Sequence, residues 1–308
     1  MSTYLVTGGA GFIGSHLCDA LVSAGERVRV VDDLSTGRRE NLPPEAELIE
    51  GSAADQALLR DALGGVAGCF HLAAIASVER GLREWLFTHR TNLGATVTLF
   101  DAIAASGQPI PVVYASSAAV YGEPVTLPLA EGARKQPLSA YGADKLGSEL
   151  HAFVATHLHG IPTVGLRFFN IYGPRQDPRS PYTGVVAIFA ERLSNGEPIT
   201  IFGDGAQTRD FVFVADAVQA LLAAMALALP HAPVFNVCTG TAVSILELAN
   251  HLAAVIGTTP KIRFAPARAG EIRHSLGASQ ALQRELGLGP PVPIRTGLTR
   301  LLAGQVTE

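Results

Sequence analysis

The start of this chain joins a short strand directly to a glycine-rich turn, and this junction constrains the fold more than any other feature. Thr3 to Val6 is an apolar run, Thr7-Gly8-Gly9-Ala10-Gly11-Phe12-Ile13-Gly14 follows it, and a helical pattern continues through Leu17 and Leu21. The turn has the Gly-x-Gly-x-x-Gly spacing at which missing side chains permit a tight turn, close helix packing and the approach of a pyrophosphate. The junction therefore predicts strand, turn and helix at the start of a dinucleotide-binding sheet.

The second strand ends in a carboxylate. Arg27 to Val31 is strand-like, and Asp32 follows it, eighteen residues after Gly14. At that distance a carboxylate accepts hydrogen bonds from a ribose 2′-hydroxyl, whereas it repels a 2′-phosphate. Neither Arg38 nor Arg39 immediately follows the strand. The pattern favours NAD over NADP.

The first half continues as alternating strands and helices. Strands are expected near 47–50, 69–72 and 111–115, and helices at 56–63 and 92–105. Nearly continuous apolar strands separated by helices predict an α/β fold, a Rossmann-type doubly wound parallel sheet with ligands at the carboxyl ends of its strands. His71 and Ser116 follow two of these strands, and for His71 a hydrogen-bonded core position is the preferred interpretation.

After Arg167 the composition turns to glycine, proline and polar residues, which indicates a smaller C-terminal substrate domain. Asp210 to Val214 is expected to be a strand that returns to the large domain, followed by an apolar helix at 215–229 and a last strand at 235–237. The predicted division is a nucleotide-binding domain of residues 1–167 plus about 211–238, and a substrate domain of residues 168–210 and 239–308.

Composition excludes several classes of partner. The net charge of −4 and the absence of clustered Lys and Arg argue against a nucleic-acid surface. The three cysteines are far apart among apolar neighbours, so packed thiols in a reducing compartment are expected, with neither disulfides nor a metal site. No apolar run approaches ~18 residues, and no basic leader precedes the first strand, so a cytoplasmic protein without a membrane segment is expected.

A phenol and an ammonium stand four positions apart in Tyr141-Gly142-Ala143-Asp144-Lys145, within a predicted helix at 139–155. At this spacing both side chains leave one helical face. A lysine held there favours the phenolate, so the tyrosine pKa, ordinarily near ~10, is expected to shift toward neutrality and allow Tyr141 to act as a base.

With these features the chain resembles the extended short-chain dehydrogenase/reductase family, and within it the NAD-dependent nucleotide-sugar epimerases and dehydratases of the UDP-glucose 4-epimerase type. The resemblance covers nearly the whole length. It is carried by the glycine loop, Asp32, Ser116–Gly122, Tyr141–Lys145, Leu166–Arg175, Ile201–Gly205, Thr208–Phe211 and Arg268–Glu271.

The resemblance implies that a UDP-sugar is epimerised at C4 through a 4-keto intermediate, with hydride removed from one face and returned to the other. Tyr141 is the implied base, Lys145 holds the nicotinamide ribose, and Ser117 hydrogen-bonds the reacting oxygen. The implied NAD contacts are Gly8, Gly11, Phe12, Ile13, Gly14, Asp32, Asp33, Ser35, Thr36, Gly37, Ser52, Ala53, Leu72, Ala73, Ala74, Asn92, Tyr141, Lys145 and Phe169. The implied substrate contacts are Ser77, Ser117, Tyr141, Asn170, Val186, Arg209, Arg268, Glu271 and Ser275.

Three positions bear on specificity. Gly51-Ser52 stands where the family usually has Gly-Asp, which weakens an expected contact to the adenine, and Ser77 to Gly81 departs from the Pro- and Ser-bearing stretch of relatives. Ser275 lies seven residues after Arg268, where related epimerases have either a bulky tyrosine or a small side chain. By resemblance, a small residue leaves room for a 2-acetamido group beside the plain hexoses UDP-glucose and UDP-galactose.

Other functions stay open from the sequence. A 4,6-dehydratase usually has an Asp-Glu pair directly after the catalytic hydroxyl residue, and Ala118 and Ala119 occupy those places. A UDP-glucuronate 4-epimerase needs only carboxylate recognition, for which Ser77, Arg80 or Arg83 is a candidate, whereas a decarboxylase is disfavoured. A non-catalytic NAD-sensing regulator has no reason to keep the catalytic residues together.

Two predicted helices carry apolar faces, with Val97, Leu99 and Phe100 on the first and Leu146, Leu150 and Phe153 on the second. In the family that the chain resembles, such a pair forms a four-helix dimer interface. Burial within one subunit is the alternative, and a homodimer is expected by resemblance alone.

Overall fold

Strands rich in apolar residues build the central sheet. Helices cover both faces of this sheet, so its strands are buried on both sides. The computed structural model describes residues 1–76, 78–178, 184–227, 231–267 and 272–305. The central sheet has seven parallel strands. Their order is β10 (Val234–Val237), β6 (Thr163–Phe168), β5 (Val112–Ser117), β4 (Gly68–His71), β1 (Thr3–Thr7), β2 (Arg27–Asp32) and β3 (Glu47–Glu50). The predicted doubly wound parallel sheet is confirmed.

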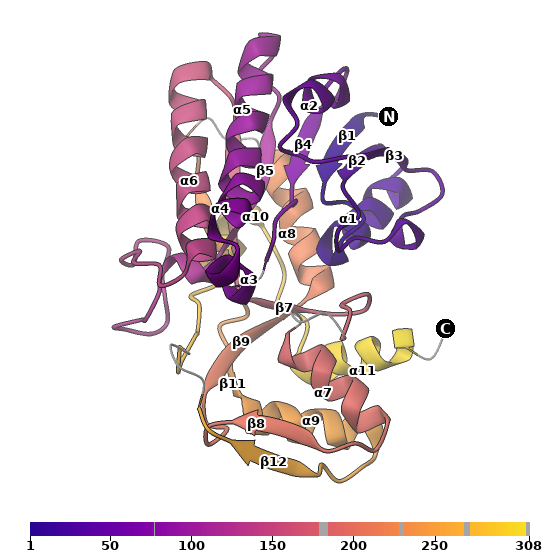
Figure 1. The fold of residues 1–308 in the computed structure, drawn as a ribbon, viewed down its shortest axis with the longest axis vertical. Coiled ribbons are helices and arrows are strands. Elements are labelled where there is room, and N and C mark those ends of the chain that lie inside the picture. The colour runs from indigo at the N-terminus through magenta and orange to yellow at the C-terminus, as the bar shows by residue number, and fades with distance from the viewer. Residues whose placement is uncertain (77, 179–183, 228–230, 268–271, 306–308) are drawn as a thin grey trace.

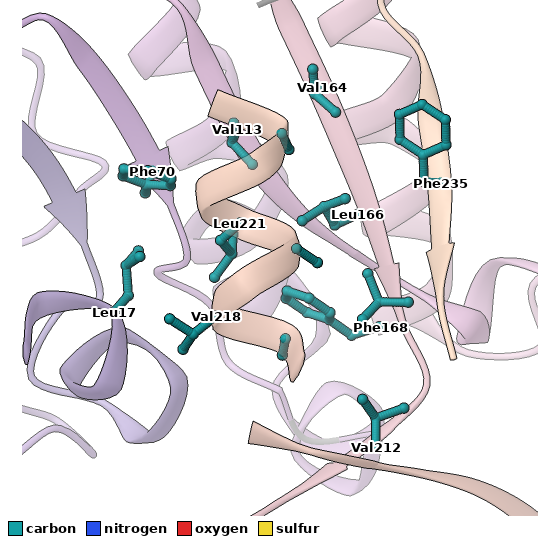
Figure 2. Close-up of a cluster of buried hydrophobic side chains, with 14 of the residues drawn as sticks. Leu17, Phe70, Val113, Val164, Leu166, Phe168, Val212, Val218, Leu221 and Phe235 are labelled. Carbon is teal, nitrogen blue, oxygen red and sulfur yellow. The ribbon is translucent and has the colours of Figure 1, made fainter. Parts of the chain in front are cut away.

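Successive side chains of a strand point to opposite faces of the sheet, so the buried residues form one core cluster on each face of the central sheet. Val113 points to a cluster with helices α1 (Phe12–Ser23) and α8 (Val214–Leu227), in which Leu221 is fully buried (Figure 2). Its neighbour Tyr114 belongs to the opposite cluster. That cluster packs under α2 (Gln56–Ala62), α5 (Ala95–Ser106) and α6 (Ala140–His159).

Short helical segments connect β4 to α5. They are α3 (Val78–Arg83), α4 (Trp85–His89) and a π-helical turn, Arg90–Gly94, that runs directly into α5. The predicted helix at 92–105 therefore begins in a longer helical stretch. Two 3₁₀ turns, Arg39–Asn41 and Ala118–Val120, also occur among the described residues of the N-terminal half.

Helix α6 starts where the sequence predicts it and extends one turn further. The hydroxyl of Ser139 accepts a hydrogen bond from Gly142 N at 3.1 Å, which caps the first turn. The helix ends at His159 and is capped by Gly160, whose φ of 66° is left-handed, a conformation that glycine adopts without steric cost.

The C-terminal part forms two small sheets below the central one (Figure 1). Strands β7 (Asn170–Tyr172), β9 (Thr208–Phe213) and β11 (Ala242–Ser244) make the first, and β8 (Ile199–Phe202) with β12 (Ile262–Ala265) the second. Helices α7 (Val185–Ser194), α9 (Ile245–Ile256) and α11 (Ile294–Gln305) pack against these small sheets. Helix α10 (Gln280–Leu286) instead packs against α8 and β10 of the central sheet.

The strand expected at Asp210 to Val214 is present as β9, which pairs with β7 and β11 in the small sheet. Helix α8, which follows it directly, packs in the core cluster of the central sheet. Strand β10 then joins the central sheet beside β6, where the last strand was expected. The division at residues 167, 211 and 238 stays a prediction. Within the described ranges no helix combines the length and the apolarity needed to cross a membrane.

Candidate active site

The glycine turn lies against the segment that follows β4, and two of its glycines are required there. Gly8 has a φ of 72°, and a Cβ on it would lie 2.7 Å from the backbone nitrogen of Ala73. A Cβ on Gly14 would collide with the carbonyl oxygen of Gly8. The turn therefore delivers the N-terminus of α1 to the carboxyl end of β1 with no side chain between them.

Asp32 supports this turn with its carboxylate. Its oxygens accept hydrogen bonds from Ala10 N at 3.0 Å and Leu34 N at 2.9 Å, so the residue joins the glycine turn to the loop after β2. Burial raises the pKa of Asp32, and the two backbone hydrogen bonds oppose that rise.

A cleft of about 690 Å³ opens along these elements. It is lined by many of the predicted cofactor residues: Gly8, Gly11, Phe12, Ile13, Gly14, Asp32, Asp33, Ser35, Thr36, Gly37, Ser52, Ala53, Leu72, Ala73 and Ala74. The N-cap of α1, Gly11, has no side chain to satisfy the first backbone N–H groups, and the first turn of α1 carries no acidic residue. These free donors at the positive end of the helix dipole suit a pyrophosphate, so the residues present fit a dinucleotide.

The proposed catalytic residues come from two elements that meet beside the cleft. Ser117 ends β5, and Tyr141 and Lys145 occupy successive turns at the start of α6. The Ser117 side chain lies close enough to Tyr141 to lower the pKa of its hydroxyl. The Lys145 ammonium lies 5.7 Å from the centre of the Tyr141 ring and donates to the carbonyl of Ala115, a cleft residue, at 2.8 Å. The structure thus brings the three side chains together.

The pKa of Tyr141 differs from the expectation. Burial raises the pKa of Tyr141, and the hydrogen bond with Ser117 only opposes that rise. Burial also lowers the pKa of Lys145 to about 8, with nearby Asp144 acting in the opposite direction. The expected shift of the tyrosine pKa toward neutrality is therefore not produced by this chain's own groups, because desolvation outweighs the contribution of Ser117.

A buried ion pair holds the two catalytic elements together. Arg167 on β6 makes two hydrogen bonds to Glu149 of α6, at 2.8 and 2.7 Å. Ser116, directly before Ser117, donates to the same carboxylate at 2.5 Å. Arg167 also donates to the Tyr121 hydroxyl at 2.7 Å. One network therefore links α6 to the end of β5 and to the loop after it.

His71 has the structural position preferred from the sequence. Its ring nitrogens lie 2.8 Å from the hydroxyl of Thr7 and 3.1 Å from that of Thr96. Burial, followed by the charge of Lys145, lowers the pKa of His71 to about 3. The ring is a neutral hydrogen-bonding bridge between strands and helix.

Besides Tyr141 and Lys145, two predicted cofactor residues lie away from the cleft lining. Asn92 is buried and clamps the backbone of Ile75, accepting from its nitrogen at 2.7 Å and donating to its oxygen at 3.2 Å. It therefore shapes the cleft through the segment after β4. Phe169 is buried in the core cluster beneath α8.

The predicted substrate residues gather only in part. Asn170 is exposed at the start of β7, opposite Phe211, and Arg209 lies two residues earlier on β9. Ser275 is half-buried and donates its backbone N–H to the Thr208 carbonyl at 3.1 Å. Val186, 2 % exposed, packs in the core between α7 and the small sheets. Ser77, Arg268 and Glu271 lie outside the described residues.

Residues that were not predicted as cofactor contacts also line the cleft. They are Arg38 and Arg80, considered from the sequence in other connections, together with Asn41, Thr91 and the segment Arg175, Gln176 and Asp177. The segment follows β7 in an irregular stretch, where neither hydrophobic period nor motif spacing marks a cofactor contact. The only sequence feature near this segment that pointed to function was the family-like stretch ending at Arg175.

Comparisons with known proteins agree with this geometry. Residues 4–238 match the model of the NAD dependent epimerase/dehydratase family. The chain is 37% identical over 304 residues to the UDP-glucose 4-epimerase of Mycolicibacterium smegmatis, covering 96% of each protein. A solved UDP-N-acetylglucosamine 4-epimerase from Methanobrevibacter ruminantium, in complex with UDP-N-acetylmuramic acid, superposes with a TM-score of 0.94 at 33% identity, over 99% of this chain and 98% of that one. The Thermus thermophilus UDP-glucose 4-epimerase in complex with NAD gives a TM-score of 0.91 at 33% identity, over 99% of each chain.

Proposed function

The chain belongs to the NAD-dependent epimerase/dehydratase family, and from that premise we propose that it interconverts the 4-epimers of a UDP-sugar. The observation that carries the proposal is the meeting of Ser117, Tyr141 and Lys145 beside the dinucleotide cleft. NAD-sensing alone would not require this trio.

Tyr141 is the proposed base on the sugar 4-hydroxyl, and Ser117 hydrogen-bonds both that oxygen and the phenol. Lys145 holds its ammonium against Ala115, where a nicotinamide ribose would lie. Bound NAD supplies hydride acceptance and return at the sugar C4, and its positive ring adds the charge that Tyr141 needs to ionise. Because the hydride returns to the opposite face, the sugar must turn within a site anchored by its nucleotide.

Several residues are proposed to hold the two ligands. The cleft-lining residues of the glycine turn, the loop after β2 and the segment after β4 would bind the dinucleotide. Asn170, Arg209 and Ser275 are proposed to bind the nucleotide-sugar, since they converge around β7 and β9. A guanidinium such as that of Arg209 suits a diphosphate in charge and geometry.

The proposal is tested by incubating purified protein separately with UDP-glucose, UDP-N-acetylglucosamine and UDP-glucuronate, without added NAD, and separating the products by chromatography. Conversion of one of them to its 4-epimer is expected. Tyr141→Phe should abolish conversion and still retain NAD, measured by its absorbance. Conversion by that variant would remove Tyr141 as the base, and no conversion by wild-type protein, even with NAD, would overturn the epimerase proposal.

Sugar preference is proposed from Ser275. Its small side chain leaves room for a 2-acetamido group, so UDP-N-acetylglucosamine should be turned over beside UDP-glucose. Ser275→Tyr should lose the first activity and keep the second. Equal rates of the variant and wild type on the acetamido sugar would remove the argument.

A homodimer is proposed from an apolar surface over α4 and α6, defined by Trp85, Leu86, Phe87, Leu150, Phe153, Val154 and Leu158, all exposed. The predicted helix faces divide in the structure, because Leu99 and Phe100 are buried inside the subunit. The double variant Leu150→Asp/Phe153→Asp should be monomeric by light scattering. Phe264→Asp, at an exposed phenylalanine on β12, is the control that should leave the assembly unchanged.

A cytoplasmic location is also proposed. Cys18, Cys69 and Cys238 are buried free thiols, as suits a reducing compartment.

A further inference from the structure

Residues 174–177 run along the dinucleotide cleft, with residues 175–177 in its lining, and we call this segment the strap. Arg175, Gln176 and Asp177 line the cleft together with the glycine turn and the loop after β2. The strap comes from the stretch that follows β7 and therefore reaches the cleft from the C-terminal half of the chain.

Helix α1 holds one end of the strap. Arg175 donates to the carboxylate of Asp19 at 2.7 Å, and the ring of His16 lies 3.0 Å from the carbonyl oxygen of Pro174. Both α1 residues stand on the helix whose N-terminus forms the pyrophosphate end of the cleft, and neither lines the cleft itself.

The loop after β2 holds the other end. Arg38 donates to Asp177 at 2.8 Å, which joins the loop beside Asp32 to the strap across 139 residues of sequence. The side chains of the two ion pairs are between 33% and 46% exposed. Water and salt therefore reach both pairs.

Two features of the strap itself point to a ligand. Arg175 has a φ of 65°, a strained conformation that persists only where the surroundings hold it, commonly at ligand clamps. The Gln176 side-chain oxygen is buried and has no hydrogen-bond partner among the described residues. A buried acceptor at the edge of this cleft is suited to a donor group of a bound dinucleotide.

We infer that the strap retains the cofactor, closed over the dinucleotide by the Arg175–Asp19 and Arg38–Asp177 pairs. The inference rests on the proposed function, in which NAD is regenerated in every cycle and has no need to leave. The four charged residues position the strap and take no part in the reaction at the sugar. Release of NAD then requires at least one pair to open.

The experiment measures NAD release from holoenzyme without any sugar. Protein purified with bound NAD is mixed with an alcohol dehydrogenase and ethanol, so that released NAD is reduced and detected by absorbance. Asp19→Asn and Asp177→Asn should each speed release by roughly 2- to 5-fold, and the double variant by about 10-fold. Raising salt from about 0.05 M to about 0.5 M should speed release from wild type and leave the double variant nearly unchanged.

Two controls separate the strap from general charge effects. Glu47→Gln removes the Arg29–Glu47 pair of 2.9 Å, which does not border the cleft, and should leave release unchanged. Asp177→Glu keeps the charge and should stay close to wild type. Wild-type release from the double variant, with sugar conversion intact, would overturn the strap and leave the proposed function standing. A protein that neither carries nor binds NAD would overturn both.

Discussion

Two arginine–carboxylate pairs near the candidate site show how burial changes the role of the same chemistry. The Arg167–Glu149 pair, whose carboxylate accepts from Ser116 beside Ser117, has side chains 3% and 7% exposed. The Arg38–Asp177 pair lies at the rim of the cleft with side chains 46% and 35% exposed. Their shortest distances, 2.7 and 2.8 Å, are nearly equal.

The environment decides what each pair contributes. Inside, each charge has lost its water, so the remaining partner is uncompensated when the other is removed. At the rim, water replaces a lost partner and salt screens the attraction. The interior pair is therefore suited to fixing the geometry of β5 and α6, and the rim pair to an element that opens and closes.

The largest expected effect is the removal of the interior carboxylate. Glu149→Ala leaves Arg167 buried without its partner and removes the acceptor of Ser116, so the free energy of unfolding should fall by about 3–5 kcal/mol. Urea denaturation measures the change. Glu149→Gln, which keeps the shape and one acceptor, should lose less. A loss below about 1 kcal/mol for Glu149→Ala would show that water replaces the carboxylate. The Arg167–Glu149 pair would then contribute no more to stability than the Arg38–Asp177 pair at the rim of the cleft.

The pH dependence of the free energy of unfolding tests the effect of burial on a second interior group, His71. The pKa of His71 is about 3 in the folded protein, lowered from 6.5, so between these values the unfolded chain binds a proton that the folded chain does not. The free energy of unfolding should therefore fall as pH falls from 6.5 toward 3, by up to about 1.4 kcal/mol per pH unit from this group.

The matched variant for this titration is His71→Asn, which keeps a hydrogen-bonding side chain and does not titrate. The difference between the two stability profiles isolates the histidine from the carboxylates, which also protonate in this range. Parallel profiles for wild type and variant would mean that His71 has the same pKa in the folded and unfolded states, contrary to its buried position between Thr7 and Thr96.

The smallest expected effect belongs to the rim. Asp177→Asn in cofactor-free protein should change the free energy of unfolding by less than about 1 kcal/mol, because both partners are solvated. Urea denaturation at low and high salt measures it, with Glu149→Ala as the large-effect reference. If Asp177→Asn lowered the free energy of unfolding as much as Glu149→Ala does, the strap would be a fixed structural element and not a segment that opens to release NAD.

Local patterns made the first half of the protein predictable. The glycine turn, the carboxylate at the end of β2 and the apolar alternation of strands each depend on residues within a few positions of one another. The capped start of α6 and the meeting of Tyr141 with Lys145 follow from helical spacing in the same way. The pKa of Tyr141 was predicted in the wrong direction because burial, which no local pattern reports, raises it.

The sequence by itself determined the parallel sheet, the dinucleotide turn and the catalytic spacing, since short-range geometry imposes them on any chain with these residues. Only the tertiary structure decided that β9 joins the small sheet, that Asn92 clamps Ile75, and that Arg38 meets Asp177. Such contacts join distant parts of the chain, and their partners are chosen by packing and desolvation, which depend on the whole fold. The glycine turn in the sequence predicted the dinucleotide cleft, whereas nothing in the sequence predicted the ion pairs that hold the strap beside it.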